Sequence, residues 1–213
     1  MNMIKILPKY TLPILLSAAA LSSSAKTYNN TPIYDTFEYV SDKRTEFIGH
    51  KVIPEGGSTE ESLLKSAPSP NVTIAGKRHK AKIVVSIKNN LLYKYNDKGD
   101  AEKVYSIATG KPSTPTHAKV GIVTHIETYP YRMAPRHTKR RRNPSAYGAY
   151  CICMNKVDPK TGEQSSTGEF IHSTNNPSSV GTKASHGCMR LFKEDITELK
   201  SQVKRGDYIL IIE

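Results

Sequence analysis

The amino-acid sequence predicts a mainly β domain with a sandwich-like or barrel-like core and one short C-terminal helix. Two observations support this fold class. From residue 81 onwards the chain consists of short runs rich in β-branched and aromatic residues, separated by Gly, Asn, Asp and Pro. Only one segment of this part, residues 193–203, carries apolar residues at helical spacing.

The predicted elements follow one another along the chain. We expect strands at residues 82–87, 91–95, 102–108, 120–128, 147–154, 168–173 and 208–212. Turn-forming residues at 96–100 join the second and third strands into a hairpin. The helix at 193–203 places Ile196, Leu199 and Val203 on one face, and Gly206 follows its end.

The N-terminus has the features of a secretory signal peptide. Lys5 and Lys9 precede an apolar run over residues 11–21, and small residues follow at 23–25. An uncleaved membrane anchor is the alternative. The run is shorter than the roughly 20 residues that span a bilayer, and Pro13 interrupts it. We therefore expect residues 1–25 to be removed on export to the periplasm or cell wall, with no stable membrane span.

Residues 26–78 show weak apolar periodicity and are rich in Pro, Gly, Ser and Asn. We interpret them as an irregular tether with one short helix near residues 60–65, although packing of this segment along the domain stays open. Residues 79–213 then form the single folded domain.

The chain is basic, with 31 Lys and Arg residues against 19 Asp and Glu and a formal net charge of +12. This excess favours an anionic partner, and for an exported protein a wall polymer or membrane headgroups fit better than nucleic acid. A dense basic run occupies residues 136–142. It is interpreted either as a lid over a cleft that attracts anionic wall components or stem carboxylates, or as a solvated loop.

The three cysteines are Cys151, Cys153 and Cys188. An odd number leaves at least one thiol unpaired in an oxidising compartment, which indicates a reactive thiol. A disulfide between Cys151 and Cys153 would be strained at this spacing, so we expect both as packed free thiols. A disulfide from either of them to Cys188 stays open, and it would block Cys188.

Residues 171–192 concentrate the side chains with catalytic chemistry. They contain, in order, His172, Ser185, His186, Gly187, Cys188 and Arg190. A thiol attacks as the thiolate, which requires an imidazole within reach and a third group that orients it. His172 ends a predicted strand, and the Ser173 carbonyl is placed to orient its ring. Gly187 would allow its own amide and that of Cys188 to face a developing oxyanion.

This pattern resembles the signature of the YkuD-type L,D-transpeptidases: a His before Ser or Gly and Thr, then Pro and Gly, then Ser-His-Gly-Cys, a hydrophobic residue and Arg or Asn. The matching residues are His172, Ser173, Thr174, Pro177, Gly181, Ser185, His186, Gly187, Cys188, Met189 and Arg190. Together with the upstream strands and the segments 109–111 and 114–116, the resemblance covers roughly residues 80–213.

The resemblance implies a cysteine acyltransferase that acts on the stem peptides of peptidoglycan. Cys188 would attack the bond between the L-centred diamino acid at position three and the D-Ala at position four. D-Ala leaves, and an amine accepts the acyl group. No metal or cofactor is implied, and we expect a monomer that contacts neither nucleic acid nor a membrane through a stable span.

The resemblance also implies roles for individual residues. His172 would be the base that activates Cys188, oriented by Ser173. His186 and Gly187 would shape the oxyanion site together with Cys188. The residues expected to contact the substrate are Arg190, Ser185 and Thr174.

The chain departs from the family pattern at two points. Ser173 stands where many members have Gly, and residues 117–120 separate the Thr-Pro segment from Gly121 without the usual aromatic residue. Two other functions stay open: an L,D-carboxypeptidase or endopeptidase with water as acceptor, and a non-catalytic wall-binding module. A zinc site built from His172, His186, Cys188 and one of the other cysteines is disfavoured, because no CxxC or HxxxH spacing supports it.

Overall fold

The structure is a computed structural model that describes residues 26–28, 31–33, 45–48, 51–54 and 59–213. The predicted signal peptide at residues 1–25 lies outside the described residues and stays a prediction. No helix in the described part of the chain is long and apolar enough to cross a membrane.

The described N-terminal segments form two antiparallel strand pairs. Strand β1 (Lys26–Tyr28) pairs with β2 (Thr31–Ile33), and β3 (Thr45–Ile48) pairs with β4 (Lys51–Pro54). Helix α1 (Glu60–Lys65) follows, and its N-cap Thr59 accepts a hydrogen bond from the Ser62 amide. The helix occupies the residues at which the sequence predicted one.

Strand β5 (Asn71–Ile74) lies within the segment that we expected to be irregular. Val72 and Ile74 are buried, whereas Asn71 and Thr73 are exposed, and this alternation suits a strand with one face on the core. It pairs antiparallel with β6. Part of the segment therefore packs on the domain, which is the alternative that the sequence left open.

The domain is built on a mixed nine-stranded sheet in the order β14-β12-β11-β10-β15-β6-β7-β8, with β5 added to β6. Its other strands are β6 (Lys77–Ser86), β7 (Leu91–Tyr95), β8 (Ala101–Ser106), β10 (Lys119–Thr128), β11 (Tyr150–Val157), β12 (Gln164–Ser173), β14 (Met189–Leu191) and β15 (Tyr208–Ile212). The pairs β12–β14 and β6–β15 are parallel, and the other pairs are antiparallel. Each strand expected from the sequence is present, although several strands begin or end at other residues than expected.

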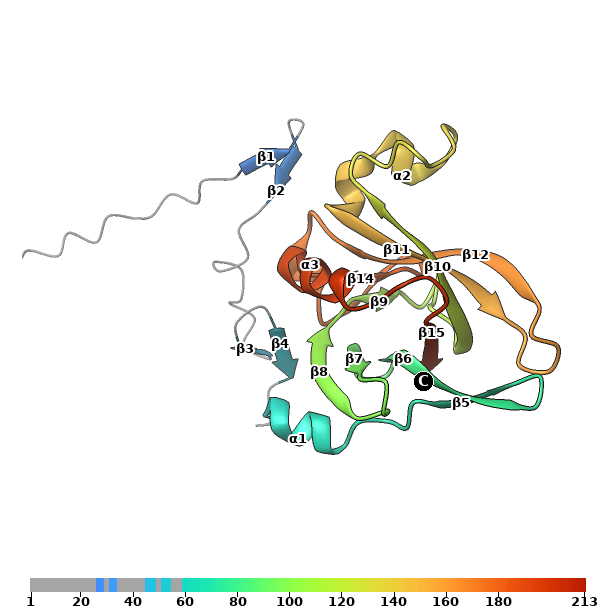
Figure 1. Cartoon of the computed structure of the whole chain (residues 1–213). Helices are drawn as coiled ribbons and strands as arrows, with labels where there is room; N and C mark the ends of the chain where they lie inside the picture. The colour runs from blue at the N-terminus through green and yellow to red at the C-terminus, as the bar shows by residue number, and fades with distance from the viewer. Residues whose placement is uncertain (1–25, 29–30, 34–44, 49–50, 55–58) are drawn as a thin grey trace, which may run out of the picture.

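The two ends of this sheet meet. Ala108 follows β8 and Arg190 lies in β14, and each donates its amide to the carbonyl of the other, at 2.8 and 2.9 Å. Because β8 and β14 are the first and last strands of the order, this bridge curls the sheet toward closure. The mainly β, barrel-like fold is therefore confirmed (Figure 1).

Alternate residues of the strands form two cores on opposite faces of the sheet. Ile83 and Val85 of β6 pack in the larger core with Ile196 and Leu199 of α3 (Lys193–Ser201). Val84, which points the other way, packs in the second core, where Leu63 and Leu64 of α1 cover the sheet. Helix α3 ends at Ser201, before the predicted 203, but Val203 still packs in the larger core.

Between β10 and β11 lies a segment that we call the cap, residues 129–149. It contains α2 (Lys139–Arg142) and the 3-10 helix η2 (Pro144–Tyr147). Tyr147, which we expected at the start of a strand, ends η2, and the strand begins at Tyr150. Figure 1 shows α2 at the top of the view, on the opposite side of the domain from α1. The remaining elements are β9 (Thr109–Gly110), β13 (Lys183–Ser185) and η3 (Pro177–Ser179).

Candidate active site

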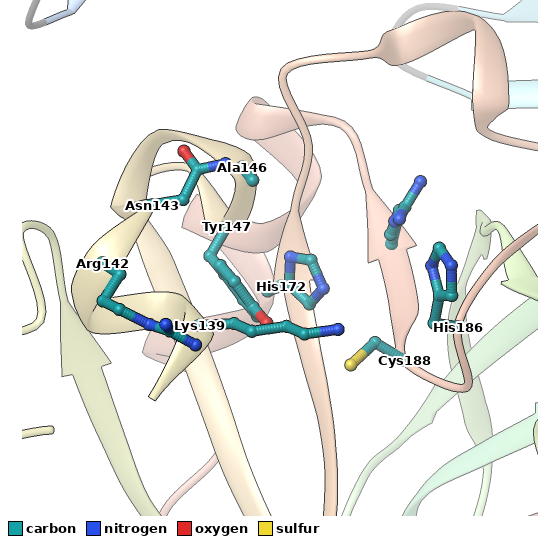
Figure 2. Close-up of a pocket in the computed structure, with 9 residues that line it drawn as sticks. Lys139, Arg142, Asn143, Ala146, Tyr147, His172, His186 and Cys188 are labelled. Carbon is teal, nitrogen blue, oxygen red and sulfur yellow. The ribbon is translucent and has the colours of Figure 1, made fainter. Parts of the chain in front are cut away.

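The parallel pairing of β12 and β14 brings Cys188 beside His172. Ile171 pairs with Met189 and His172 with Arg190, so the turn that enters β14 runs along the end of β12. A cavity of about 420 Å³ opens at this point, lined by Lys139, Arg142, Asn143, Ala146, Tyr147, His172, His186, Cys188 and Arg190. Figure 2 shows the Cys188 thiol pointing toward the strand that carries His172.

The His172 imidazole is fixed in one orientation. It is 3% exposed, and its Nδ1 lies 2.5 Å from the Ser173 carbonyl oxygen. Because a carbonyl oxygen only accepts, Nδ1 carries the proton and Nε2 of the neutral ring is an acceptor. The Tyr147 ring packs against the imidazole with the ring centres 4.6 Å apart. The Ser173 carbonyl thus occupies the position expected for it, and the catalytic role of the pair is a proposal.

Burial keeps both groups neutral at rest. It lowers the pKa of His172 to about 4, with the Arg190 charge acting in the same direction and the hydrogen bond to Ser173 opposing it. It raises the pKa of the Cys188 thiol to about 11, and the nearby Glu169 carboxylate adds to this effect. A hydrogen bond from the Phe170 backbone and the Arg190 charge oppose the rise. At neutral pH the site therefore holds a thiol and a neutral imidazole.

The turn before Cys188 is held by buried hydroxyl groups. Ser185 is fully buried, and its hydroxyl donates to the Cys188 carbonyl at 2.6 Å while accepting from the Gly187 amide at 3.0 Å. Gly187 has φ +111°, a conformation that favours glycine. The Thr116 hydroxyl donates to the Gly187 carbonyl at 2.8 Å. These bonds set the position of the thiol.

One sequence-based expectation about this turn needs correction. The Gly187 amide does not face the cavity as a free oxyanion donor, because it donates to the Ser185 hydroxyl. Ser185 supports the turn, since its hydroxyl is buried and makes both of these internal bonds, and its contact with substrate stays a prediction. The Cys188 amide has no recorded acceptor among the described residues, so it is the donor that the turn leaves available.

Thr174 and His186 have different surroundings from each other. Thr174 is buried, accepts from the Asn176 amide at 3.0 Å and lines a separate, smaller cavity that Cys188 does not reach, so its predicted substrate contact is not supported. His186 lines the main cavity, and in Figure 2 it lies on the other side of Cys188 from His172. It is exposed, and the charge of Lys111 lowers its pKa. Arg190 lines the cavity as expected.

The sequence left the basic run as either a lid or a solvated loop, and it did not assign Asn143, Ala146 or Tyr147 to the site. Nothing in the sequence indicated which side chains of the run turn inward. Arg140 does so toward Glu127: its Nε lies 2.6 Å from Oε2 and its terminal nitrogen 3.2 Å from Oε1. The same guanidinium lies 4.6 Å from the centre of the Phe170 ring. Arg140 therefore fastens α2 to the sheet.

The segment at residues 117–120, which departs from the family pattern, contacts β12 close to Cys188. Lys119 forms a largely buried ion pair with Glu169, which precedes Phe170 on β12. The Glu169 carboxylate lies close to the nucleophile turn, because a Cβ added to Gly187 would be 3.5 Å from Glu169 Oε1. The departure from the family pattern thus places a cation on a carboxylate that acts on the Cys188 thiol.

All three cysteines are free, and Cys151 and Cys153 are buried. Burial also raises the pKa of the Cys151 thiol. Among the described residues, the side chains grouped closely enough to hold a metal are His125, Glu127 and Cys153, with ligand atoms within 4.8 Å of one another. Glu127 already accepts from Arg140, and its Oε1 lies 3.2 Å from His125 Nε2. The zinc ligands considered from the sequence do not form such a group.

Comparison with known proteins identifies relatives of this site. Residues 80–212 match the YkuD family, the L,D-transpeptidase catalytic domain. The chain is 29% identical over 168 residues to YkuD of Bacillus licheniformis, a candidate L,D-transpeptidase, with 72% of this chain and 87% of the relative covered. It is 34% identical over 110 residues to YkuD of Bacillus subtilis, named in the same way, with 51% and 52% covered.

Solved structures of low identity resemble the domain. One is the catalytic domain of the L,D-transpeptidase from Enterococcus faecium, with 22% identity, 62% of this chain and 97% of that chain covered, and a TM-score of 0.42. Another is an L,D-transpeptidase from Mycobacterium tuberculosis, with 19% identity, coverage of 63% and 59%, and a TM-score of 0.44.

Proposed function

Because the chain belongs to the YkuD family of L,D-transpeptidase catalytic domains, we propose that it is a cysteine acyltransferase acting on the tetrapeptide stems of peptidoglycan. The family match confirms the resemblance that the signature around Cys188 predicted. One observation carries the mechanism: the Cys188 thiol and the oriented imidazole of His172 line the same cavity. Cysteine acyl transfer needs a nucleophile and a base in this relation.

In the first half of the reaction, Cys188 Sγ adds to the carbonyl carbon of the L-centred diamino acid at position three. Since both groups are neutral at rest, the thiol proton moves to His172 Nε2 as the C–S bond forms. The Cys188 amide is placed to stabilise the oxyanion. Collapse of the adduct breaks the C–N bond, and His172 returns the proton to the nitrogen of the departing D-Ala.

In the second half, an amine attacks the thioester. His172 Nε2 takes a proton from the amine, the C–N bond forms, the C–S bond breaks, and the proton returns to Sγ. The enzyme is regenerated without any external oxidant or reductant. An amine on a second stem would yield a cross-link, which is the wall-building reaction that we propose.

We further propose that the reaction takes place outside the cytoplasmic membrane, in the periplasm or cell wall. The charged, apolar and small-residue regions of residues 1–25 support export. Peptidoglycan stems are found in that compartment, so the predicted location and the proposed substrate agree.

The decisive experiment is to incubate the purified protein with disaccharide-tetrapeptide and to follow the products by mass spectrometry. We expect a dimer that has lost one D-Ala. A tripeptide as the sole product would instead indicate water as the acceptor. The absence of any product from folded, reduced protein would refute both reactions.

Two cysteine variants make a matched control. Cys188→Ala should abolish product formation, whereas Cys153→Ala should retain it, because Cys153 is buried away from the cavity. Both variants should unfold cooperatively in denaturant. A Cys188→Ala protein that still releases D-Ala would overturn the assignment of the nucleophile.

A further inference from the structure

The basic residues of α2 divide into two groups with different environments. Arg140 is bound to Glu127 and packs on Phe170, which anchors the helix. Lys139 and Arg142 line the cavity that contains Cys188. Their spacing of three places them on one face of the helical turn. In Figure 2, both extend from the cap, and Lys139 reaches across the cavity toward Cys188.

The cavity is lined with positive charge. Arg190 is added to Lys139 and Arg142, and no Asp or Glu lines the cavity. Among the described residues neither Lys139 nor Arg142 takes part in an ion pair, although Arg140 between them does. The Nε of Arg190 is buried without a hydrogen-bond acceptor in the same part of the chain. Cations left without partners around a cavity favour an anionic ligand.

We propose that Lys139 and Arg142 bind a free carboxylate of the donor peptide, so that the enzyme prefers stems with free carboxylates over stems in which these groups are amidated. This inference rests on the proposed function, because the ligand is the peptide that presents its carbonyl to Cys188. Lys139 and Arg142 lie on the cap, whereas Arg190, which lines the same cavity, lies on β14. A donor held between them carries negative charge on the side that faces α2.

The position of these cations depends on the anchor beneath them. Glu127 is 4% exposed at its side chain and holds Arg140 through two nitrogen atoms. A bidentate contact fixes the orientation of a guanidinium, and through it the turn of helix that carries both neighbours. Lys139 and Arg142 therefore face the cavity because Arg140 faces the sheet.

The test measures acylation of Cys188 by donor alone, with intact-protein mass spectrometry, over a range of donor concentrations. Two tetrapeptide donors are compared, one with free carboxylates and one amidated. For the variant Lys139→Gln/Arg142→Gln, we expect the half-saturating concentration of the free donor to rise about tenfold or more, since hydrogen bonds to charged groups are lost. The amidated donor and the maximal rate should change little.

Arg136→Gln/Arg141→Gln is the matched control. It removes the same two charges from the basic run, but neither residue lines the cavity. It should leave the half-saturating concentration of both donors within about twofold, which also excludes a general loss of protein charge as the cause. An equal effect of the double variant on both donors, or no effect on the free donor, would overturn the proposal.

Failure of the proposed function can be recognised separately. A wild-type protein that is acylated by neither donor refutes the proposed reaction. The carboxylate site is then tested by calorimetric binding of the two peptides to the Cys188→Ala protein and to Cys188→Ala/Lys139→Gln/Arg142→Gln. Tighter binding of the free donor that is lost in the second protein supports the site, and equal binding of both donors refutes it.

Discussion

The hydroxyl of Ser173 occupies the space in which a side chain on Gly148 would begin. A Cβ built on Gly148 would lie 1.7 Å from Ser173 Oγ. That hydroxyl accepts from the Ala149 amide at 3.2 Å and donates to the Tyr147 carbonyl at 3.4 Å. The residue whose carbonyl orients the His172 imidazole therefore also ties the cap to β12. This gives a physical reason for Ser in place of the more common Gly.

This contact predicts that substitutions of Gly148 and Ser173 have non-additive effects on the free energy of unfolding. Gly148→Ala should reduce the free energy of unfolding by roughly 2–4 kcal/mol, because Cβ overlaps Ser173 Oγ and because φ +68° disfavours a side chain. Adding Ser173→Gly should recover the part due to overlap but not the part due to φ. Denaturant unfolding of both single variants and the double variant measures this coupling. Strictly additive effects would show that the close approach is not energetically important.

The anchor of the cap should be sensitive to loss of one partner. Arg140→Ala leaves Glu127 charged and buried, which is expected to cost about 3–5 kcal/mol in unfolding free energy. Glu127→Ala/Arg140→Ala should be more stable than either single variant, because no uncompensated charge remains. Urea denaturation gives the free energies. A double variant that is less stable than both single variants would show that the effect is not due to an unpaired charge.

His172 should make the free energy of unfolding decrease at acid pH. Its pKa of about 4 in the folded protein lies below the ordinary value of 6.5, so the unfolded chain binds more protons between these pH values. Stability is therefore full above pH 6.5 and is lost as pH falls toward 4, by about 3 kcal/mol for this residue. His172→Gln should show a smaller loss over the same range. Identical pH profiles for the two proteins would contradict the burial of a neutral imidazole.

The Lys119–Glu169 pair should tune the nucleophile. The Glu169 carboxylate raises the pKa of the Cys188 thiol, so Glu169→Gln should lower the pH at which the thiol becomes alkylated. Lys119→Met should act in the opposite direction, because it leaves the carboxylate without its counter-charge. The pH dependence of iodoacetamide modification measures both shifts. Shifts of the same sign in the two variants would argue against an electrostatic cause.

The sequence by itself determined the strands and the family. Alternating or fully apolar runs such as residues 91–95 and 208–212 became β7 and β15 with the same bounds, since burial of side chains on a sheet follows local pattern. The signature around Cys188 indicated the family, which the match over residues 80–212 confirmed. The sequence also indicated that the Ser173 carbonyl would bind the His172 imidazole, because the two residues are neighbours in the chain.

Only the tertiary structure decided which groups face the cavity. The Gly187 amide was expected to be free, but the buried hydroxyl of Ser185 takes it. The sequence left the basic run as either a lid or a solvated loop. The residue that fixes the orientation of its helix is Glu127, which lies on β10. Hydrogen bonds and ion pairs between distant segments depend on how the sheet curls. Local sequence pattern carries no information on that geometry.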